Sequence, residues 1–120
     1  MAKILIVDDS LWWRKRMSKL VESMGHEIMT LGCVENTLNA LNLSLPDCII
    51  TDLIMPDGEG FQIVEAVNKK NPQIPVIVLT ADFQEETIKR CKELGAFEVI
   101  QKELVKKSLA DIVTRALEKS

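Results

Sequence analysis

The chain has 120 residues, of which 47% are hydrophobic and 28% charged, and its formal net charge is −3. This balance is typical of one folded globular domain and argues against a disordered chain. No block of Lys and Arg runs along the sequence, which argues against nucleic acid as the main partner.

Membrane insertion and a disulfide framework are also disfavoured. No apolar stretch approaches the ~18 residues of a membrane span, and the first residues lead straight into a predicted strand. Cys33, Cys48 and Cys91 are odd in number and lack metal-ligand spacing, which favours a reducing compartment. We therefore expect a cytoplasmic protein.

Apolar runs that predict strands alternate with amphipathic segments that predict helices. The predicted strands are Lys3–Val7, His26–Leu31, Cys48–Asp52, Ile74–Leu79 and Phe97–Ile100. The predicted helices are Leu11–Met24, Val34–Leu43, a segment that opens at Glu59-Gly60 and stops before Asn71, Gln84–Leu94 and Val105–Leu117. Gly25 and Gly95 are expected to end the first and fourth helices. Strict alternation of this kind predicts an α/β fold with a parallel sheet and right-handed crossovers.

Polar side chains follow four of the predicted strands where each strand ends. Asp8 and Asp9 follow the first strand, Asp52 ends the third, Thr80 follows the fourth and Lys102 follows the fifth. Ligands bind at this edge of open α/β sheets, and Pro56 and Asp57-Gly58 turn the chain away just after Asp52.

Carboxylates crowded at one edge need a proton or a cation, and a hard divalent ion such as Mg²⁺ suits oxygen ligands. The Thr80 hydroxyl and the Lys102 ammonium suit an anionic phosphoryl group, whose transfer depends on positioning and charge neutralisation. Because a carboxylate can act as a nucleophile, Asp52 is the candidate phosphoryl acceptor and Asp8 and Asp9 are the candidate metal ligands.

The same residues resemble the receiver domains of response regulators, and the similarity covers the whole chain. The matching motifs are Ile6-Val7-Asp8-Asp9-Ser10, Pro46-Asp47, Asp52-Leu53-Ile54-Met55-Pro56, Gly60, Ile77-Val78-Leu79-Thr80-Ala81, Gly95-Ala96 and Lys102. The resemblance, closest to stand-alone CheY-like regulators, implies a single receiver domain over residues 1–120. It also implies a doubly wound five-stranded parallel sheet with five helices and strand order 2-1-3-4-5.

Site roles follow from the resemblance as expectations. A histidine kinase is expected to phosphorylate Asp52, with Mg²⁺ bound by Asp9, Asp52 and the backbone carbonyl of Ile54. Asp8 is expected to act mainly through water or by orienting that shell. Thr80 and Lys102 are expected to contact the phosphoryl group.

Two positions depart clearly from the family pattern, and a third, Glu59 before Gly60, is a mild change at a helix start. Val99 stands where an aromatic switch residue is usual, three residues before Lys102, and Glu103 replaces the usual proline after the lysine. A non-proline cis bond costs ~2.5–4 kcal/mol, so we expect the Lys102-Glu103 bond to be trans. By the resemblance, Ile54 and Asp82 would set the lifetime of the phosphoryl group.

These expectations define a signalling protein that is not an enzyme in the usual sense, although it assists its own phosphorylation and dephosphorylation. Its expected partners are the histidine kinase, a downstream target protein and a phosphatase, in chemotaxis or a phosphorelay, with the protein itself a monomer. Trp13 fits the apolar stripe of its helix, whereas Trp12 is a candidate partner contact.

Three alternatives remain. The departures at Val99 and Glu103 favour a phosphorylation-independent interaction module with the same fold. An aspartate-based phosphohydrolase would use an acid two residues after Asp52, where Ile54 stands. A flavodoxin-like cofactor binder would need a phosphate-cradling loop after the first strand, where Asp8 and Asp9 stand.

Overall fold

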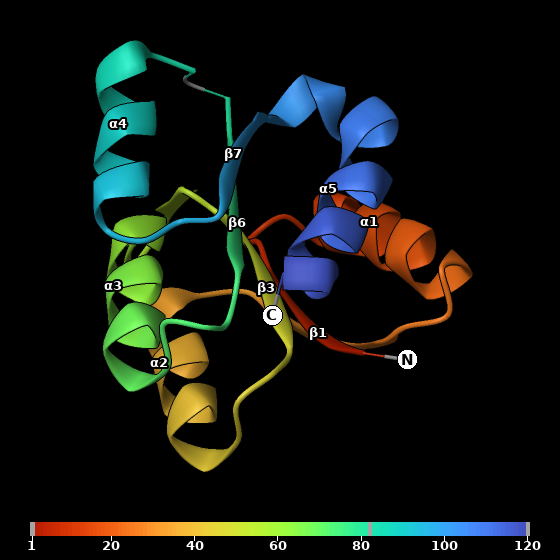
Figure 1. The fold of residues 1–120 in the computed structure, drawn as a ribbon, viewed down its shortest axis with the longest axis horizontal. Helices are drawn as coiled ribbons and strands as arrows, with labels where there is room; N and C mark the ends of the chain where they lie inside the picture. The colour runs from red at the N-terminus through yellow and green to blue at the C-terminus, as the bar shows by residue number, and fades with distance from the viewer. Residues whose placement is uncertain (1, 82, 120) are drawn as a thin grey trace.

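The computed structural model describes residues 2–81 and 83–119, and they form one parallel sheet between two layers of helices (Figure 1). The sheet strands are β1 (Lys3–Val7), β2 (Glu27–Leu31), β3 (Cys48–Asp52), β6 (Val76–Thr80) and β7 (Glu98–Gln101). Their spatial order is β2-β1-β3-β6-β7 and every pair is parallel. The predicted α/β sheet and strand order are confirmed.

Among the described residues, four α-helices lie between successive sheet strands and a fifth follows β7. Figure 1 shows α1 (Leu11–Ser23) and α5 (Val105–Lys119) on one face of the sheet. The other face is covered by α2 (Val34–Leu43), α3 (Gly60–Lys70) and α4 (Glu85–Glu93). Across the described part of the chain, the helices lack the combined length and apolar character needed to cross a membrane.

Alternation along the strands produces two cores, because successive side chains point to opposite faces of the sheet. The residues packed under α2, α3 and α4 include Leu5, Val7, Ile49, Val76, Val78 and Val99. The residues packed under α1 and α5 include Ile4, Ile6, Cys48, Ile50, Ile77, Leu79 and Ile100. Burial on both faces explains why the three inner strands β1, β3 and β6 are mostly apolar in sequence.

Several predicted boundaries shift by one or two residues. The fourth sheet strand starts at Val76 instead of Ile74, because Pro75 lacks the N–H that a strand in the middle of a sheet donates. Helices α1 and α4 end as predicted at Gly25 and Gly95, whose φ values of 90° and 110° suit glycine.

A short antiparallel hairpin after β3 was not predicted. It consists of β4 (Ile54–Met55) and β5 (Gly58–Glu59), joined by the turn expected at Pro56 and Asp57. The hairpin returns the chain to β3, where Gly60 N donates to Leu53 O at 2.6 Å. A Cβ on Gly60 would lie 2.6 Å from the backbone oxygen of Asp52, so this approach requires glycine.

The same hairpin caps a helix that is distant in sequence. Asp57 Oδ1 accepts from Val34 N and Asp57 Oδ2 accepts from Glu35 N, both at 2.9 Å. The N-cap residue of α2, Cys33, makes no side-chain capping bond of its own, so Asp57 supplies this cap from another segment. These two backbone donors lower the pKa of the Asp57 carboxyl.

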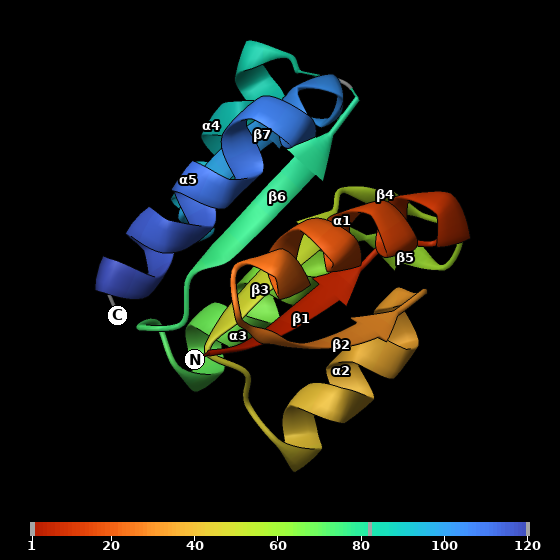
Figure 2. The same cartoon turned by 90° about the vertical axis from the view of Figure 1, so that its right-hand side faces the viewer.

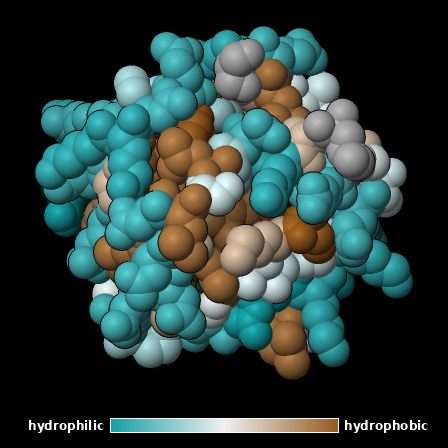
Figure 3. Space-filling model, turned by 90° about the horizontal axis from the view of Figure 1, so that it is seen from below, coloured by the Kyte–Doolittle hydropathy of each residue, from teal (hydrophilic) through white to brown (hydrophobic). Residues whose placement is uncertain are grey.

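The surface at the amino-terminal edge of the sheet carries an apolar patch. Figure 3 views the molecule from below and shows apolar side chains gathered between hydrophilic ones. Leu43 and Leu45, near the end of α2 and the start of β3, are among the exposed large hydrophobic residues. The acidic residues predicted to form the site belong to the opposite edge, towards which the strand arrows point in Figure 2.

Replacing Gly60 by alanine should destabilise the fold by about 1–3 kcal/mol, because the new methyl group would overlap the Asp52 backbone. Urea unfolding measures the change. Gly58→Ala is a matched control, since its nearest neighbour would be the end of the flexible Gln62 side chain. Equal stability of the two variants would contradict the proposed close approach.

Replacing Asp57 by alanine should lower the urea midpoint at neutral pH, because α2 loses its charged cap. A carboxyl with a lowered pKa stabilises the folded state above its unfolded value, 3.8 here, and this contribution disappears as the pH falls through the folded value. The midpoints of wild type and Asp57→Ala should therefore converge in acid. A constant difference across the pH range would show that the carboxylate charge plays no part.

Candidate functional site

The predicted site residues lie together at the carboxyl edge of the sheet. Asp8 and Asp9 directly follow β1, Asp52 is the last residue of β3 and Thr80 is the last residue of β6. Lys102 begins a short 3-10 helix, η1 (Lys102–Leu104), directly after β7. The register pairs Asp52 with Leu79 and Thr80 with Gln101. The strands β3, β6 and β7 therefore end within one residue of one another along the sheet.

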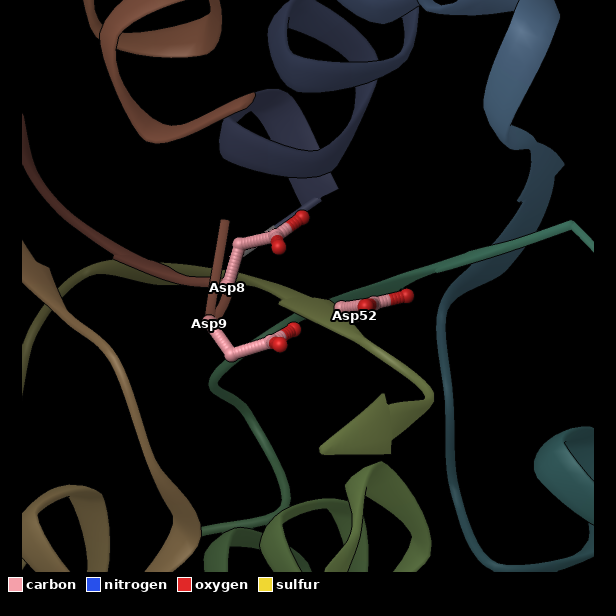
Figure 4. A group of neighbouring side chains, drawn as sticks. All are labelled: Asp8, Asp9 and Asp52. Carbon is pink, nitrogen blue, oxygen red and sulfur yellow. The ribbon is translucent and has the colours of Figure 1, made fainter. Parts of the chain in front are cut away.

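Three carboxylates lie close together at the site. One oxygen from each of Asp8, Asp9 and Asp52 lies within 4.8 Å of the others, and Figure 4 shows their side chains extending towards a common space. Asp8 and Asp52 are buried, whereas Asp9 is exposed. The cluster is therefore open to solvent on the Asp9 side.

Lys102 neutralises part of this charge. Its Nζ lies 2.9 Å from Asp8 Oδ2 and 3.3 Å from Asp52 Oδ2, and its side chain is only 13% exposed. Among the described residues, the fully buried Asp8 Oδ2 has no hydrogen-bond partner, so its contact is the ion pair with this ammonium. Dissolved salt screens such a partly buried pair much less than it screens an exposed pair.

The electrostatics still disfavour a charged Asp52. Burial and the neighbouring Asp8 carboxylate raise the pKa of Asp52, while Lys102 and the Leu53 backbone N–H act in the opposite direction. Leu53 N donates to Asp52 Oδ1 at 2.9 Å. A further cation beside Asp52 would therefore favour its charged carboxylate form.

Asp8 is held by the chain that follows it. Its Oδ1 accepts from Ser10 N at 2.9 Å, and its backbone oxygen accepts from Arg14 Nη1 at 2.6 Å. Its own N–H donates to Leu31 O at 3.1 Å. The role of Arg14 was not predicted, because a basic residue in a helix shows no partner in the sequence.

The donor set fits Mg²⁺. The three carboxylates offer only oxygen ligands, and their residual negative charge matches a small hard cation that keeps some of its waters. Ile54, the predicted carbonyl ligand, lies in β4 two residues after Asp52, and its side chain is 60% exposed. Its ligand role stays a prediction.

The two departures from the family pattern have structural consequences. The Lys102-Glu103 bond is trans as predicted, since the described residues contain no cis peptide bond. Val99 is a buried core residue instead of part of an exposed surface, and it packs in the same cluster as Cys91. Thr80 is fully buried, and Asp82 lies outside the described residues.

One aromatic contact at the site was missed by sequence reasoning. Trp13 packs against the core under α1 and α5, as its apolar stripe predicted, but its ring also faces Lys102, with Nζ 5.0 Å from the ring centroid. Trp12 is 59% exposed, consistent with its expected position outside the core.

The Asp52→Asn variant should be more stable than wild type in metal-free buffer. Like charges 4 Å apart repel by about 4 kcal/mol at an effective dielectric of 20, and loss of the Lys102 attraction cancels much of this. We expect a net gain on the order of 1 kcal/mol, measured by urea unfolding with a chelator. Added Mg²⁺ should stabilise wild type more than the variant, and a destabilised Asp52→Asn would contradict this account.

Comparison with known proteins agrees with this geometry. The chain is 33% identical over 116 residues to the DNA-binding transcriptional regulator NtrC of Azospirillum brasilense, a match covering 97% of this chain and 24% of that protein. It is 30% identical over 119 residues to the transcriptional regulatory protein GlrR of Escherichia coli (strain K12), covering 99% of this chain and 27% of that protein. The chain thus spans about a quarter of the length of these relatives.

A solved structure and a family profile extend the comparison. The crystal structure of NtrX from Brucella abortus superposes with a TM-score of 0.89 at 27% identity, covering 98% of this chain and 27% of that one. The profile of the response regulator receiver domain matches residues 4–114, a span that includes every strand end at the site. With this sheet order and acidic edge, the chain belongs to the family of response regulator receiver domains, the phosphoacceptor signalling domains of two-component systems.

Proposed function

We propose that Asp52 accepts a phosphoryl group from the phosphohistidine of a histidine kinase and that the phosphorylated protein then binds a downstream target. The observation that supports this most directly is the position of Asp52. Its carboxylate lies at a strand end, within 4.8 Å of two other carboxylates and 3.3 Å from the Lys102 ammonium. Phosphoryl transfer needs such charge neutralisation far more than covalent help from the protein.

The proposed transfer assigns a role to each residue. An Asp52 carboxylate oxygen attacks the phosphorus, the P–N bond to the kinase histidine breaks, and the imidazole leaves with the bonding electron pair and takes up a proton. Lys102 and Thr80 contact the phosphoryl oxygens. Asp9, Asp52 and the Ile54 carbonyl, with Asp8 behind them, would hold Mg²⁺, which when bound neutralises charge on the phosphoryl oxygens.

We also propose how the phosphoryl group is lost, a step that membership of the family does not establish. Hydrolysis of the phosphorylated Asp52, assisted by the same residues, would return the protein to its resting state, alone or with a phosphatase. The matched relatives named above are transcriptional regulators, whereas a role in chemotaxis or a phosphorelay, a cytoplasmic location and a monomeric state remain predictions from the sequence.

A phosphorylation-independent interaction module is the second candidate. It is favoured by the buried Val99, which leaves no ring at the position of the usual aromatic switch. The chemical test below separates the two candidates, because only the phosphoacceptor requires a reactive Asp52.

Incubation with acetyl phosphate and Mg²⁺ should add about 80 Da to the intact mass, the mass of one phosphoryl group. The adduct should be absent in Asp52→Asn and strongly reduced when a chelator removes Mg²⁺. Asp57→Asn is the matched control, because this nearby acid caps α2 and should leave the adduct intact.

Failure of the wild-type protein to form the adduct at any Mg²⁺ concentration would overturn the phosphoacceptor and leave the interaction module. An adduct that persists in Asp52→Asn would instead place the acceptor at another residue.

A further inference from the structure

The ammonium of Lys102 has a third neighbour besides its two carboxylates. Nζ lies 2.9 Å from Asp8 Oδ2, 3.3 Å from Asp52 Oδ2 and 5.0 Å from the centroid of the Trp13 ring. A cation within about 6 Å of an aromatic centroid is attracted by the electrons of the ring face. The ammonium is therefore held between two carboxylates and one indole ring.

The ring and one of the carboxylates are fixed by the same short segment. Ser10 N donates to Asp8 Oδ1 at 2.9 Å, and Ser10 Oγ accepts from Trp13 N at 3.3 Å, which caps α1. Trp12 lies edge-on to the Trp13 ring, with centroids 4.8 Å apart, but it is 59% exposed, so we expect the Ser10 cap and the core to hold Trp13 without it. The start of α1 thus sets the positions of Asp8 and the ring together.

The three neighbours of Lys102 differ in what competes for them. The Asp8 and Asp52 carboxylates belong to the acidic cluster that suits a divalent cation, so that cation and the ammonium compete for the same oxygens. The Trp13 ring is a poor ligand for such a hard cation. The attraction of the ring for Lys102 therefore persists when a divalent cation also binds the two carboxylates.

The local backbone makes this contact more important. Lysine is a point charge on a flexible four-carbon stem, and the bond that follows Lys102 is an ordinary trans bond to Glu103. Contacts of the ammonium itself must then restrict its position. Of these contacts, the ring is the one that carries no charge.

We propose that Trp13 is a positioning residue, which holds the Lys102 ammonium beside Asp52 for phosphoryl transfer. Trp13 acts through Lys102 and does not touch the phosphoryl group. The inference rests on the proposed role of Asp52 as acceptor, and the experiments below distinguish the failure of one from the failure of the other.

Trp13 also packs against the core under α1 and α5, so the experiments must separate positioning from packing. Three variants serve this purpose. Trp13→Phe keeps a weaker aromatic face, Trp13→Leu keeps only apolar volume, and Trp12→Leu removes the exposed neighbouring ring. Urea unfolding of each variant gives its stability, against which the other measurements are compared.

The first measurement is the NMR shift of the Lys102 ε-methylene protons, with and without Mg²⁺ and without any phosphodonor. Protons over an aromatic face shift upfield, so in wild type and Trp12→Leu these resonances should lie upfield of those of lysines that face no ring. Lys119 is left out of that reference set, because its Nζ lies 5.3 Å from the Phe97 ring centroid. The shift should be reduced in Trp13→Phe and lost in Trp13→Leu. Lys102 resonances at ordinary positions in wild type would overturn the inference.

The second measurement is the rate of Asp52 phosphorylation by acetyl phosphate with Mg²⁺, followed by intact mass. Loss of a partly buried cation–π contact should slow Trp13→Leu by about fivefold, with Trp13→Phe between it and wild type. Trp12→Leu should stay within about twofold of wild type.

If wild type is phosphorylated and Trp13→Leu reacts at the same rate, the positioning role is overturned and Asp52 is still the acceptor. Equal rates in Trp13→Phe and Trp13→Leu would assign Trp13 to packing alone and would also overturn it. A wild type without any Asp52 adduct would overturn both proposals.

Discussion

The ion pairs of Lys102 with Asp8 and Asp52 are the contacts on which the functional edge of the sheet depends. Lys102 follows β7, Asp8 follows β1 and Asp52 ends β3, and they meet with N–O distances of 2.9 and 3.3 Å. Without the ammonium, two buried carboxylates would face each other, and a buried charge left without its partner typically costs 3–5 kcal/mol. The charge balance at this edge of the sheet is therefore tied to a single lysine.

The same arrangement would suit the proposed phosphoryl transfer to Asp52. A phosphoryl group on Asp52 would bring about 1.5–2 negative charges to a position where an ammonium is already present. The resting ion pairs and the phosphorylated state would use one cation, which only has to move from carboxylate to phosphoryl oxygens. Little reorganisation is then needed, which is the condition under which fixed charges contribute most to catalysis.

Sequence and structure agree where the determining interactions are local or periodic. Strands with two buried faces, helices with one apolar stripe and polar residues at strand ends are all visible in the order of residues. The sheet could therefore be predicted, and so could the placement of Asp8, Asp9, Asp52, Thr80 and Lys102 at its carboxyl edge. The Asp57 cap on α2 and the contact of Trp13 with Lys102 could not. Each joins segments far apart in the chain through side chains whose local pattern suggests another role.

The segment after β3 also restricts how a change at Asp52 can spread. Leu53 N donates to Leu79 O, Gly60 N donates to Leu53 O, and Asp57 ties the hairpin to α2. On the other side, Val99 fills a space in the core beside α4 and has no ring to rotate. Packed cores switch between discrete arrangements and do not deform continuously. If Asp52 is phosphorylated as proposed, the change would spread through these hydrogen bonds, through Thr80 at the end of β6 or through Lys102, because the Val99 side chain offers no movable ring.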